Sequence, residues 1–289
     1  MGRILNSYDE FRDKRGMRMI KVEKAFTHGG RFHADDVFSA ALLTILNPEI
    51  QIERGFQVPE NYNGIVFDIG FGAFDHHQAD KEIRENGIPY AAFGLLWRKF
   101  GTELLSEEQV KRFDEKFVQP IDLSDNTGEK NDISDMIGSF NPSWSENLDG
   151  DLCFHKAKEF AVQILMRKFQ YYKDEEKADE IVEEAMKNAA GEILILPQFV
   201  PWKNKVVGTS IKFVVFPSMR GGFNAQAVPK TEDSPELLVP FPESWRGKNG
   251  NELQIESGID DLTFCHASGF LIAADTLEGA KKACLQAMN

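Results

Sequence analysis

Residues 22–46 of the 289-residue chain read VEKAFTHGGRFHADDVFSAALLTIL, and this stretch decides the fold class. Residues 22–27 have the short apolar pattern of a β-strand, and a Gly-Gly turn follows them. Residues 36–46 are apolar on nearly every side of a helix, which indicates a helix buried against a sheet. A strand, a buried helix and a further strand in units of this size predict a mostly parallel, doubly wound sheet.

The rest of the chain predicts an α/β protein with two domains. In the first part, strands are expected at residues 50–54 and 65–69, and helices at residues 90–100, 106–123 and 151–190. After Gly191 the pattern changes to strands at residues 205–216, 223–228 and 262–273, with a helix at residues 276–288. We therefore expect an extension over residues 1–24, a large domain over residues 25–190 and a smaller α/β domain over residues 191–289.

The composition excludes several classes of protein. Lys and Arg number 33 and Asp and Glu number 46, so the net charge of −13 argues against coating nucleic acid through bulk positive charge. Three cysteines are too few for a disulfide framework or a cysteine-rich zinc site, which favours a reducing compartment. No apolar run approaches the ~20 residues of a membrane helix, and residues 1–24 match neither a secretory nor a mitochondrial leader. We expect an intracellular, cytoplasmic protein without a membrane span.

Histidines and carboxylates gather where the predicted strands end. Four of the six histidines lie between residues 28 and 77. The cluster in sequence consists of His28, His33, Asp35, Asp36, Asp68, Asp75, His76 and His77. Ligands of open α/β sheets bind at the carboxyl ends of the strands, so we expect these side chains to converge.

Mixed imidazole and carboxylate ligands suit Mn²⁺, with Zn²⁺ and Co²⁺ as competitors, whereas Mg²⁺ alone would need fewer histidines. One catalytic ion takes about three protein ligands, so the set favours two ions. Two ions ~3.5–4 Å apart stabilise the attacking and leaving oxygens of a phosphoryl displacement. As alternatives, a single histidine after a strand is more often structural, and Asp36 or Asp35 could simply cap the helix. The adjacent His76 and His77 behind Asp75 are harder to explain in this way.

The chain resembles the MYG family (melanocyte proliferating gene products, long labelled metal-dependent protein hydrolases). Through Asp75-His76-His77 it also resembles the wider DHH phosphoesterase superfamily of exonucleases, oligoribonucleases and pyrophosphatases. In the first domain the carrying segments are THGGRFHADDVFSAALL from Thr27, FDIG from Phe67, FDHHQ from Phe74, YAAFGLLWRKFG from Tyr90, IDLSDN from Ile121 and FNPSW from Phe140. In the second they are NAQAVP from Asn224, ESWRG from Glu243 and HASGF from His266. The resemblance implies a DHH-type catalytic domain followed by a substrate domain.

The resemblance also implies roles for the clustered residues. The implied metal ligands are His28, His33, Asp35, Asp68, His76 and one of Asp122 and Asp125. Asp68 would bridge the two ions, His77 would bind metal or reach a phosphoryl oxygen, and Asp75 would orient a neighbouring histidine. Of the two aspartates in the fourth motif we favour Asp125, because it precedes the Asn-Thr-Gly turn.

The second domain offers groups that suit a nucleic-acid substrate. Residues 193–231 contain no acidic residue but carry five basic residues and five aromatic ones, a mixture that single-stranded nucleic acid favours. The alternative, which we favour for most of the aromatic residues, is that they belong to the core of a sheet. By resemblance, the loop beginning at His266 contacts phosphate. The expected substrate-binding residues are His77, His266, Ser268, Gly269, Arg246 and Arg220.

Together these features predict a hydrolase with two divalent ions, Mn²⁺ being the expected metal and Mg²⁺, Co²⁺ or Zn²⁺ the alternatives. The expected activity is that of an exonuclease on single-stranded RNA or short oligonucleotides. A small-molecule pyrophosphatase or nucleotide phosphatase is the nearest alternative, and a catalytically silent RNA-binding protein is another. A homodimer, and a nuclear or mitochondrial location by family resemblance, stay open.

Overall fold

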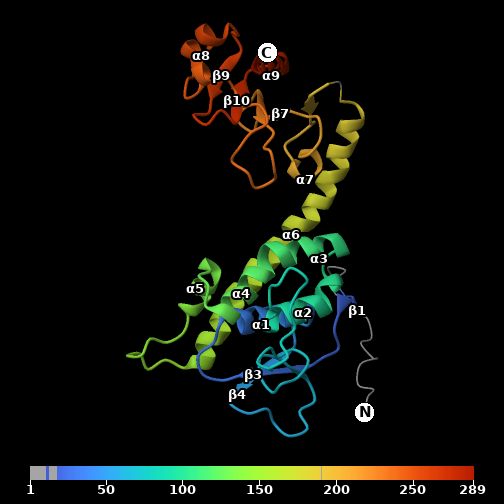
Figure 1. Ribbon diagram of the computed structural model, residues 1–289, viewed down its shortest axis with the longest axis vertical. Helices are drawn as coiled ribbons and strands as arrows, with labels where there is room; N and C mark the ends of the chain where they lie inside the picture. Colours follow the sequence, from blue (N-terminus) through green and yellow to red (C-terminus); the bar gives the residue numbers. More distant parts are fainter. Residues whose placement is uncertain (1–10, 13–17, 190) are drawn as a thin grey trace. The chain divides into compact units, whose positions relative to one another are not determined.

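The computed structural model describes residues 11–12, 18–189 and 191–289, and the chain divides into two compact units, Met1–Tyr172 and Lys173–Asn289 (Figure 1). Most of the expected extension over residues 1–24 lies outside the described residues, apart from an antiparallel pair of short strands, β1 (Phe11–Arg12) and β2 (Arg18–Met19). The division falls within helix α6 (Gly150–Lys187), whereas the boundary expected near residue 190 comes after the end of this helix.

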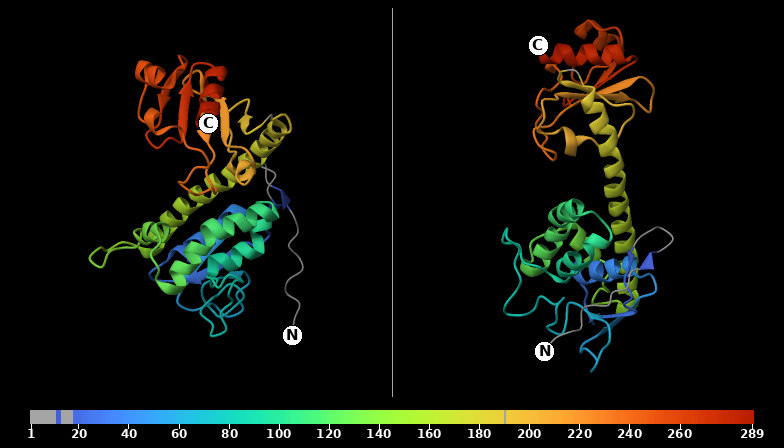
Figure 2. Two further views of the ribbon diagram at one scale, coloured as in Figure 1. Left: turned by 45° about the horizontal axis from the view of Figure 1, so that its top comes forward. Right: turned by 90° about the vertical axis from the view of Figure 1, so that its right-hand side faces the viewer.

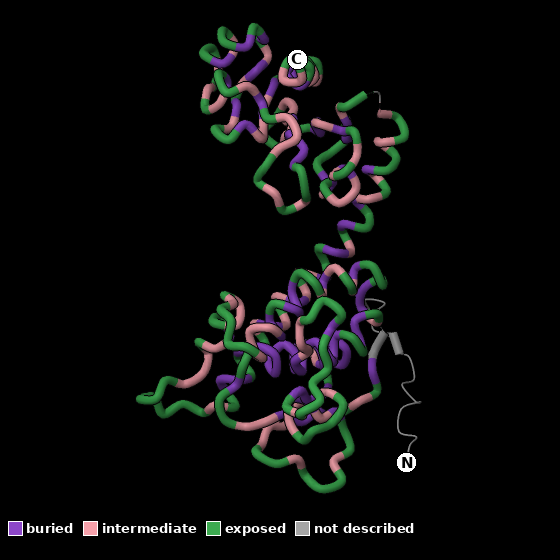
Figure 3. The backbone as a smooth tube through the Cα atoms, in the orientation of Figure 1, coloured by how far each residue is buried: buried purple, intermediate pink, exposed green. Residues whose placement is uncertain are grey.

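A parallel sheet of three strands organises the first unit. Strand β3 (Lys24–His28) lies between β4 (Gln51–Gly55) and β5 (Ile65–Val66) and is parallel to both. Helix α1 (Ala34–Leu46) connects β3 to β4 and is buried at every position except Thr44, as its apolar sequence predicts. Figure 3 shows the buried backbone gathered in the interior of each unit. The expected parallel α/β arrangement is thus present in this unit.

Strand β5 is shorter than its apolar sequence predicts. The pattern IVFDI favours a strand through residue 69, but regular pairing ends at Val66. At Asp68 the backbone has a φ of 56°, in the left-handed region that aspartate tolerates better than most residues. A single parallel bridge between Phe67 and Phe74 closes the following loop. The chain therefore leaves the sheet at Asp68, one of the metal ligands expected from the sequence.

Several short helices follow β5 in the first unit. They are α2 (Ala92–Phe100), η1 (Gly101–Glu103), α3 (Glu107–Phe113), η2 (Asp114–Val118), α4 (Gln119–Thr127) and α5 (Asp132–Gly138). The helix expected over residues 106–123 is thus a succession of α3, η2 and α4, which continues to Thr127. It ends at Gly128, whose φ of 72° favours glycine. Helices α2, α4 and α5 all contact α1, which fixes the position of the residues at its N-terminus.

The second unit contains a mixed sheet of five strands in the order β6-β7-β8-β10-β9. Its elements are β6 (Ile193–Ile195), α7 (Lys203–Val206), β7 (Phe213–Pro217), β8 (Phe223–Ala227), η3 (Glu243–Trp245), α8 (Gly250–Ser257), β9 (Leu262–Cys265), β10 (Leu271–Ala274) and α9 (Leu277–Met288). Strands β6 and β7 are parallel, and the other neighbours are antiparallel. Helix α9 packs on β7, β8 and β10 (Figure 2).

Two strand predictions in this unit are wrong in their extent. Residues 205–216 were expected as one strand, but the chain forms α7 and a turn at Gly208 (φ 87°) before β7 begins. Residues 262–273 form two antiparallel strands, because a turn containing Gly269 (φ 71°) reverses the chain.

The prediction that most interleaved aromatic residues belong to the core is confirmed for three of them. Trp202, Phe213 and Phe216 are buried, whereas Phe199 is exposed. No described helix combines the length and apolar composition that crossing a membrane requires.

Candidate metal centre

The histidines and carboxylates predicted from the sequence lie together at one edge of the parallel sheet. His28 is the last residue of β3, and Asp68 follows β5 by two residues. Asp35 and Asp36 lie in the first turn of α1, where negative charge is also favourable to the helix. Asp125 comes from the last turn of α4. Four separate elements therefore supply the site.

Three groups of side chains each place one ligand atom per residue within 4.8 Å of the others. The groups are Asp68, His76 and His77; His28, Asp36 and Asp68; and His33, Asp35 and Asp125. Asp68 belongs to two groups and therefore connects them. One of its oxygens, Oδ1, lies 3.1 Å from His76 Nε2, and the other, Oδ2, lies 3.2 Å from His28 Nε2. This geometry suits a carboxylate between two ions.

The Nε2 atom of His76 lies among three carboxylates. Besides Asp68, it is 3.2 Å from Asp125 Oδ2 and 3.7 Å from Asp35 Oδ2. His33 Nδ1 lies 3.6 Å from the other oxygen of Asp125. Asp125 thus joins the third group to His76, and all the clustered groups form one centre.

Several buried polar atoms of this centre form no hydrogen bond with the described residues. They are both carboxylate oxygens of Asp35, Oδ2 of Asp36, Oδ1 of Asp68 and Nε2 of His76. A buried polar atom without a partner costs roughly 1–3 kcal/mol, and more when it is charged. Such atoms rarely gather in one place unless a ligand satisfies them. The donor set fits divalent cations with mixed nitrogen and oxygen preference.

The pKa values of the centre reflect its burial and its closely spaced carboxylates. Burial raises the pKa of Asp35 well above its usual value, and the nearby carboxylates of Asp68 and Asp125 raise it further. Burial lowers the pKa of His28, but its contacts with Asp36 and Asp68 outweigh this and raise the pKa to about 10. Burial also opposes ionisation of Asp68, yet His28 and His76 hold its pKa at about 2. The centre thus concentrates negative charge that histidines offset only in part.

Asp75 and His77 form a pair beside the centre. Nδ1 of His77 is 2.7 Å from Asp75 Oδ1, and the other oxygen of Asp75 accepts a hydrogen bond from the backbone N–H of Phe71 at 2.6 Å. Burial raises the pKa of Asp75, but the bonds from His77 and Phe71 outweigh it and hold the pKa below its usual range. The carboxylate therefore orients the His77 ring and leaves Nε2 available to a ligand.

Two residues of the centre were not among the metal ligands that the sequence analysis named. Asp36 was placed in the cluster, with capping of α1 as its alternative role, and it is the third residue of this helix. Its Oδ1 accepts from the His33 N–H while its Oδ2 lies 3.1 Å from His28 Nε2. Asn126 lies next to Asp125, with Oδ1 3.4 Å from His76 Nδ1. The contacts of these two residues with histidines could not be predicted from the sequence, since they join distant segments.

Asp122, named as an alternative ligand, is engaged elsewhere. Its Oδ2 lies 2.7 Å from the Nη2 of Arg84, and its Oδ1 accepts a hydrogen bond from the N–H of Gly94 at 3.1 Å. A Cβ at position 94 would overlap this carboxylate. Of the two aspartates of α4, Asp125 is therefore the one that reaches the histidines.

Comparison with known proteins places the chain in a family. A family model named for the MYG1 exonuclease and described as "Uncharacterised protein family (UPF0160)" matches residues 24–288. The chain belongs to the MYG1 family. It is 30% identical over 314 residues to the MYG1 protein of Dictyostelium discoideum, covering 91% of this chain and 95% of that protein.

Two mammalian members of the MYG1 family carry a name that includes an activity. The MYG1 exonuclease of Mus musculus is 30% identical over 313 residues, which cover 88% of this chain and 82% of that protein. The MYG1 exonuclease of Homo sapiens is 29% identical over 320 residues, covering 91% and 85%. No solved structure matches. The MYG1 match includes the elements of both units, so the family resemblance expected from the motifs is confirmed.

The second unit of this MYG1 family member holds most of the predicted substrate-binding residues in one loop cluster. His266 Nδ1 lies 2.9 Å from the Ser268 hydroxyl and accepts a hydrogen bond from the Ser268 N–H at 3.2 Å. Arg246 Nε donates to the carbonyl of Phe241, and a Cβ at Gly269 would lie 2.6 Å from that nitrogen. Arg220 lies in the turn between β7 and β8, and no described contact joins it to this cluster.

Proposed function

We propose that this chain is a divalent-metal-dependent phosphoesterase of the DHH type that acts as an exonuclease on single-stranded RNA or short oligonucleotides. The observation that carries the proposal is the set of buried carboxylate and imidazole atoms without hydrogen-bond partners around Asp68. The mammalian relatives named MYG1 exonuclease support the nuclease part. The proposal includes that the first unit is a DHH-type domain with a doubly wound sheet.

Charge balance favours two ions over one. Asp35, Asp36, Asp68 and Asp125 carry four negative charges when ionised, which two divalent ions neutralise. With imidazole nitrogens among the donors, Mn²⁺ is the proposed metal. Two such ions, when bound, supply Lewis-acid activation of a water molecule and of the scissile phosphate.

The chain's own residues would position the reacting groups. Asp68, His28 and His76 would be among the residues that hold the ions, with Asp68 shared between the two groups. His77, oriented by Asp75, would present Nε2 to a phosphoryl oxygen or to the leaving group. In the second unit, His266 and Arg246 would contact phosphates away from the scissile bond.

The test is hydrolysis by the purified chain with Mn²⁺, measured on single-stranded RNA, single-stranded DNA, pyrophosphate and a minimal chromogenic diester. We expect release of mononucleotides from the end of the RNA, and no release after chelation of the metal. Faster cleavage of pyrophosphate than of any oligonucleotide would instead indicate a small-molecule pyrophosphatase. Binding of RNA and Mn²⁺ without hydrolysis of any substrate would indicate a silent RNA-binding protein.

A second measurement tests the substrate-binding role of the loop in the second unit. Remote contacts help hold a reacting phosphate in line, so their loss lowers kcat as well as raising KM. We expect His266→Ala to impair cleavage of oligonucleotides more than cleavage of the minimal diester. Equal losses on both substrates would contradict this role.

A further inference from the structure

A hollow in the first unit lies directly beside the metal centre. It is lined by Arg31, His33, Ser124, Asp125, Ser134 and Ser139, among others. His33 and Asp125 also line the cavity of the metal centre itself. The two spaces therefore adjoin, and a ligand at the metal centre can extend into this neighbouring space, the Arg31 hollow.

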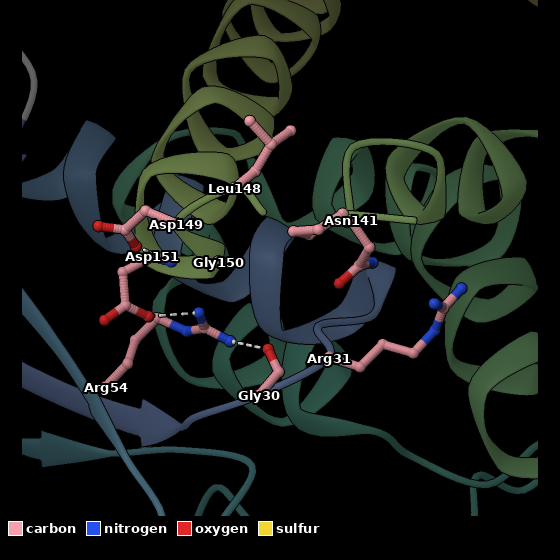
Figure 4. A pocket seen from close by; sticks show the side chains of 9 residues that line it. Gly30, Arg31, Arg54, Asn141, Leu148, Asp149, Gly150 and Asp151 are labelled. Carbon is pink, nitrogen blue, oxygen red and sulfur yellow. Dashed lines mark hydrogen bonds and ion pairs between the residues drawn. The ribbon is translucent and has the colours of Figure 1, made fainter. Parts of the chain in front are cut away.

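Arg31 is exposed and forms no hydrogen bond or ion pair with the described residues. Arg54, close to it, is used within the fold instead. Its guanidinium binds the carboxylate of Asp151 at 2.7 Å and the carbonyl of Gly30 at 2.9 Å, and stacks on Phe154. Figure 4 shows the Arg31 side chain pointing away from these groups. Of these two arginines, only Arg31 offers its donors to a ligand.

The segment that carries Arg31 is held in place by one side chain. Asn141, from the FNPSW segment, accepts a hydrogen bond from the Phe32 N–H at 3.0 Å and donates one to the Phe32 carbonyl at 2.9 Å. Phe32 lies between Arg31 and His33 in the sequence. The backbone that carries Arg31 and His33 is thus held in place. The distance between Arg31 and the metal centre is therefore maintained.

The lining of the hollow also contains serine hydroxyl groups. The Oγ of Ser134 is buried and forms no hydrogen bond with the described residues, and Ser124 lies on the same lining. Ser139 lines the hollow too, but its hydroxyl donates to the Met136 carbonyl at 2.6 Å. Hydroxyls donate to anionic oxygens, and a guanidinium binds phosphate with paired hydrogen bonds. Asp135 also lines the hollow, and its negative charge weakens the binding of a free anion there. A phosphate tethered to one already held at the metal centre overcomes this through its high effective concentration.

We propose that the Arg31 hollow is a phosphate subsite, which binds the phosphodiester adjacent to the scissile one in an oligonucleotide. The inference rests on the proposed function, because it places the scissile phosphate at the metal centre. It adds that the first unit itself contacts a second phosphodiester of the substrate, next to the scissile one. A substrate with one phosphate leaves the subsite empty.

The test compares Arg31→Ala and Arg31→Lys with Lys111→Ala, which removes an exposed positive charge from α3, outside the hollow. Binding is measured in Mn²⁺ with a single-stranded oligonucleotide of hydrolysis-resistant phosphorothioate linkages, and turnover with the minimal chromogenic diester. We expect Arg31→Ala to weaken oligonucleotide binding about tenfold, the effect of one charge-assisted hydrogen-bonding group. The slope of log affinity against log salt should fall by about 0.7.

Arg31→Lys should recover part of the affinity and the whole salt slope, and Lys111→Ala should bind as the unchanged chain does. The subsite is disproved if Arg31→Ala binds the oligonucleotide normally. It is also disproved if the variant loses Mn²⁺ affinity and minimal-diester turnover as strongly as oligonucleotide affinity, because Arg31 then supports the metal centre. If the unchanged chain hydrolyses no phosphoester yet binds the oligonucleotide in an Arg31-dependent way, the proposed function fails and the subsite stands.

Discussion

Asp122 and the aspartates of the metal centre lie close together in the first unit, but their partners differ. Asp122 on α4 is paired within the chain, with the guanidinium of Arg84 at 2.7 Å and with a backbone N–H, although burial still raises its pKa to about 7. Arg84 also binds Asp114 at 2.8 Å and stacks over the ring of Tyr90. One helical turn further on, Asp125 faces other carboxylates and histidines, with no lysine or arginine bound to it among the described residues.

The difference lies in the source of the positive charge. A protein that needs a buried carboxylate for stability alone can supply a partner from its own sequence, as Arg84 does. Around Asp35, Asp36 and Asp68, histidines are the only ion-pair partners among the described residues, and several carboxylate oxygens form no hydrogen bond. Burying carboxylates with so few hydrogen bonds is costly, which supports the proposal that a divalent cation binds here.

The largest effect is expected from Asp68→Asn. Asparagine tolerates the left-handed backbone at this position, so the fold should persist, but the amide is a poor bridging ligand. Loss of the metal contribution, several kcal/mol, should lower turnover by about 1,000-fold or more. Hydrolysis assays and Mn²⁺ titration calorimetry measure both effects, with circular dichroism as the control for folding. Normal turnover at the usual metal concentration would remove Asp68 from the mechanism.

Arg84→Met tests the aspartate that is paired within the chain. Leaving Asp122 buried without its cation should lower the free energy of unfolding of the first unit by about 3–5 kcal/mol. The matched control is Arg98→Met, which breaks an exposed ion pair with Glu82 and should cost no more than about 1 kcal/mol. Urea denaturation followed by circular dichroism gives both values. Equal losses of unfolding free energy in the two variants would mean that the buried Arg84–Asp122 pair contributes no more to stability than the exposed pair.

Added Mn²⁺ should stabilise the chain through the metal centre alone. At a free concentration of about 100 times the Kd, binding to the folded state contributes about 2.7 kcal/mol, or roughly 5–11 °C in Tm. A chelator should reverse the shift, and Asp68→Asn should reduce it. An equal shift in Asp68→Asn would place the stabilising ion elsewhere.

The smallest effect is expected at Asn126, which contacts His76 Nδ1 on the side away from the carboxylates. Removing a group that orients a metal-binding imidazole typically weakens metal affinity by about tenfold or somewhat more. Asn126→Ala should show this loss in Mn²⁺ titrations. Thr127→Ala is the matched control on the same helix. Its hydroxyl donates to the Leu123 carbonyl and accepts from the Glu129 N–H, so it contacts none of the clustered histidines and carboxylates, and affinity should stay unchanged. A similar loss in both variants would indicate a general effect on α4.

Local sequence patterns predicted the elements that position the site. The apolar run of β3, the mostly apolar α1 and the histidines at the strand ends predicted that the clustered side chains would converge at one edge of the sheet, and they do lie together there. Contacts across long stretches of sequence were not predictable in this way. Asp122 and Arg84, which pair, are 38 positions apart in the sequence. The contact of Asp36 with His28 depends on the position of the end of β3 relative to α1. The end of β5 was also missed, since an apolar pattern does not reveal a left-handed residue.

The metal centre also depends on Gly94, which is not one of its ligands. Metal-binding assays on ligand variants would not reveal this dependence. Gly94 lies within α2, where a methyl group would meet the Asp122 carboxylate and, at 2.6 Å, the Arg84 guanidinium. Any other residue there forces α2 and α4 apart or expels the carboxylate. Helix α4 also carries Asp125. A larger residue at position 94 would therefore displace Asp125 together with α4 and disturb the metal site. In an unbiased mutational screen, position 94 should therefore tolerate substitution as poorly as the ligands themselves, although it has no side chain to contribute.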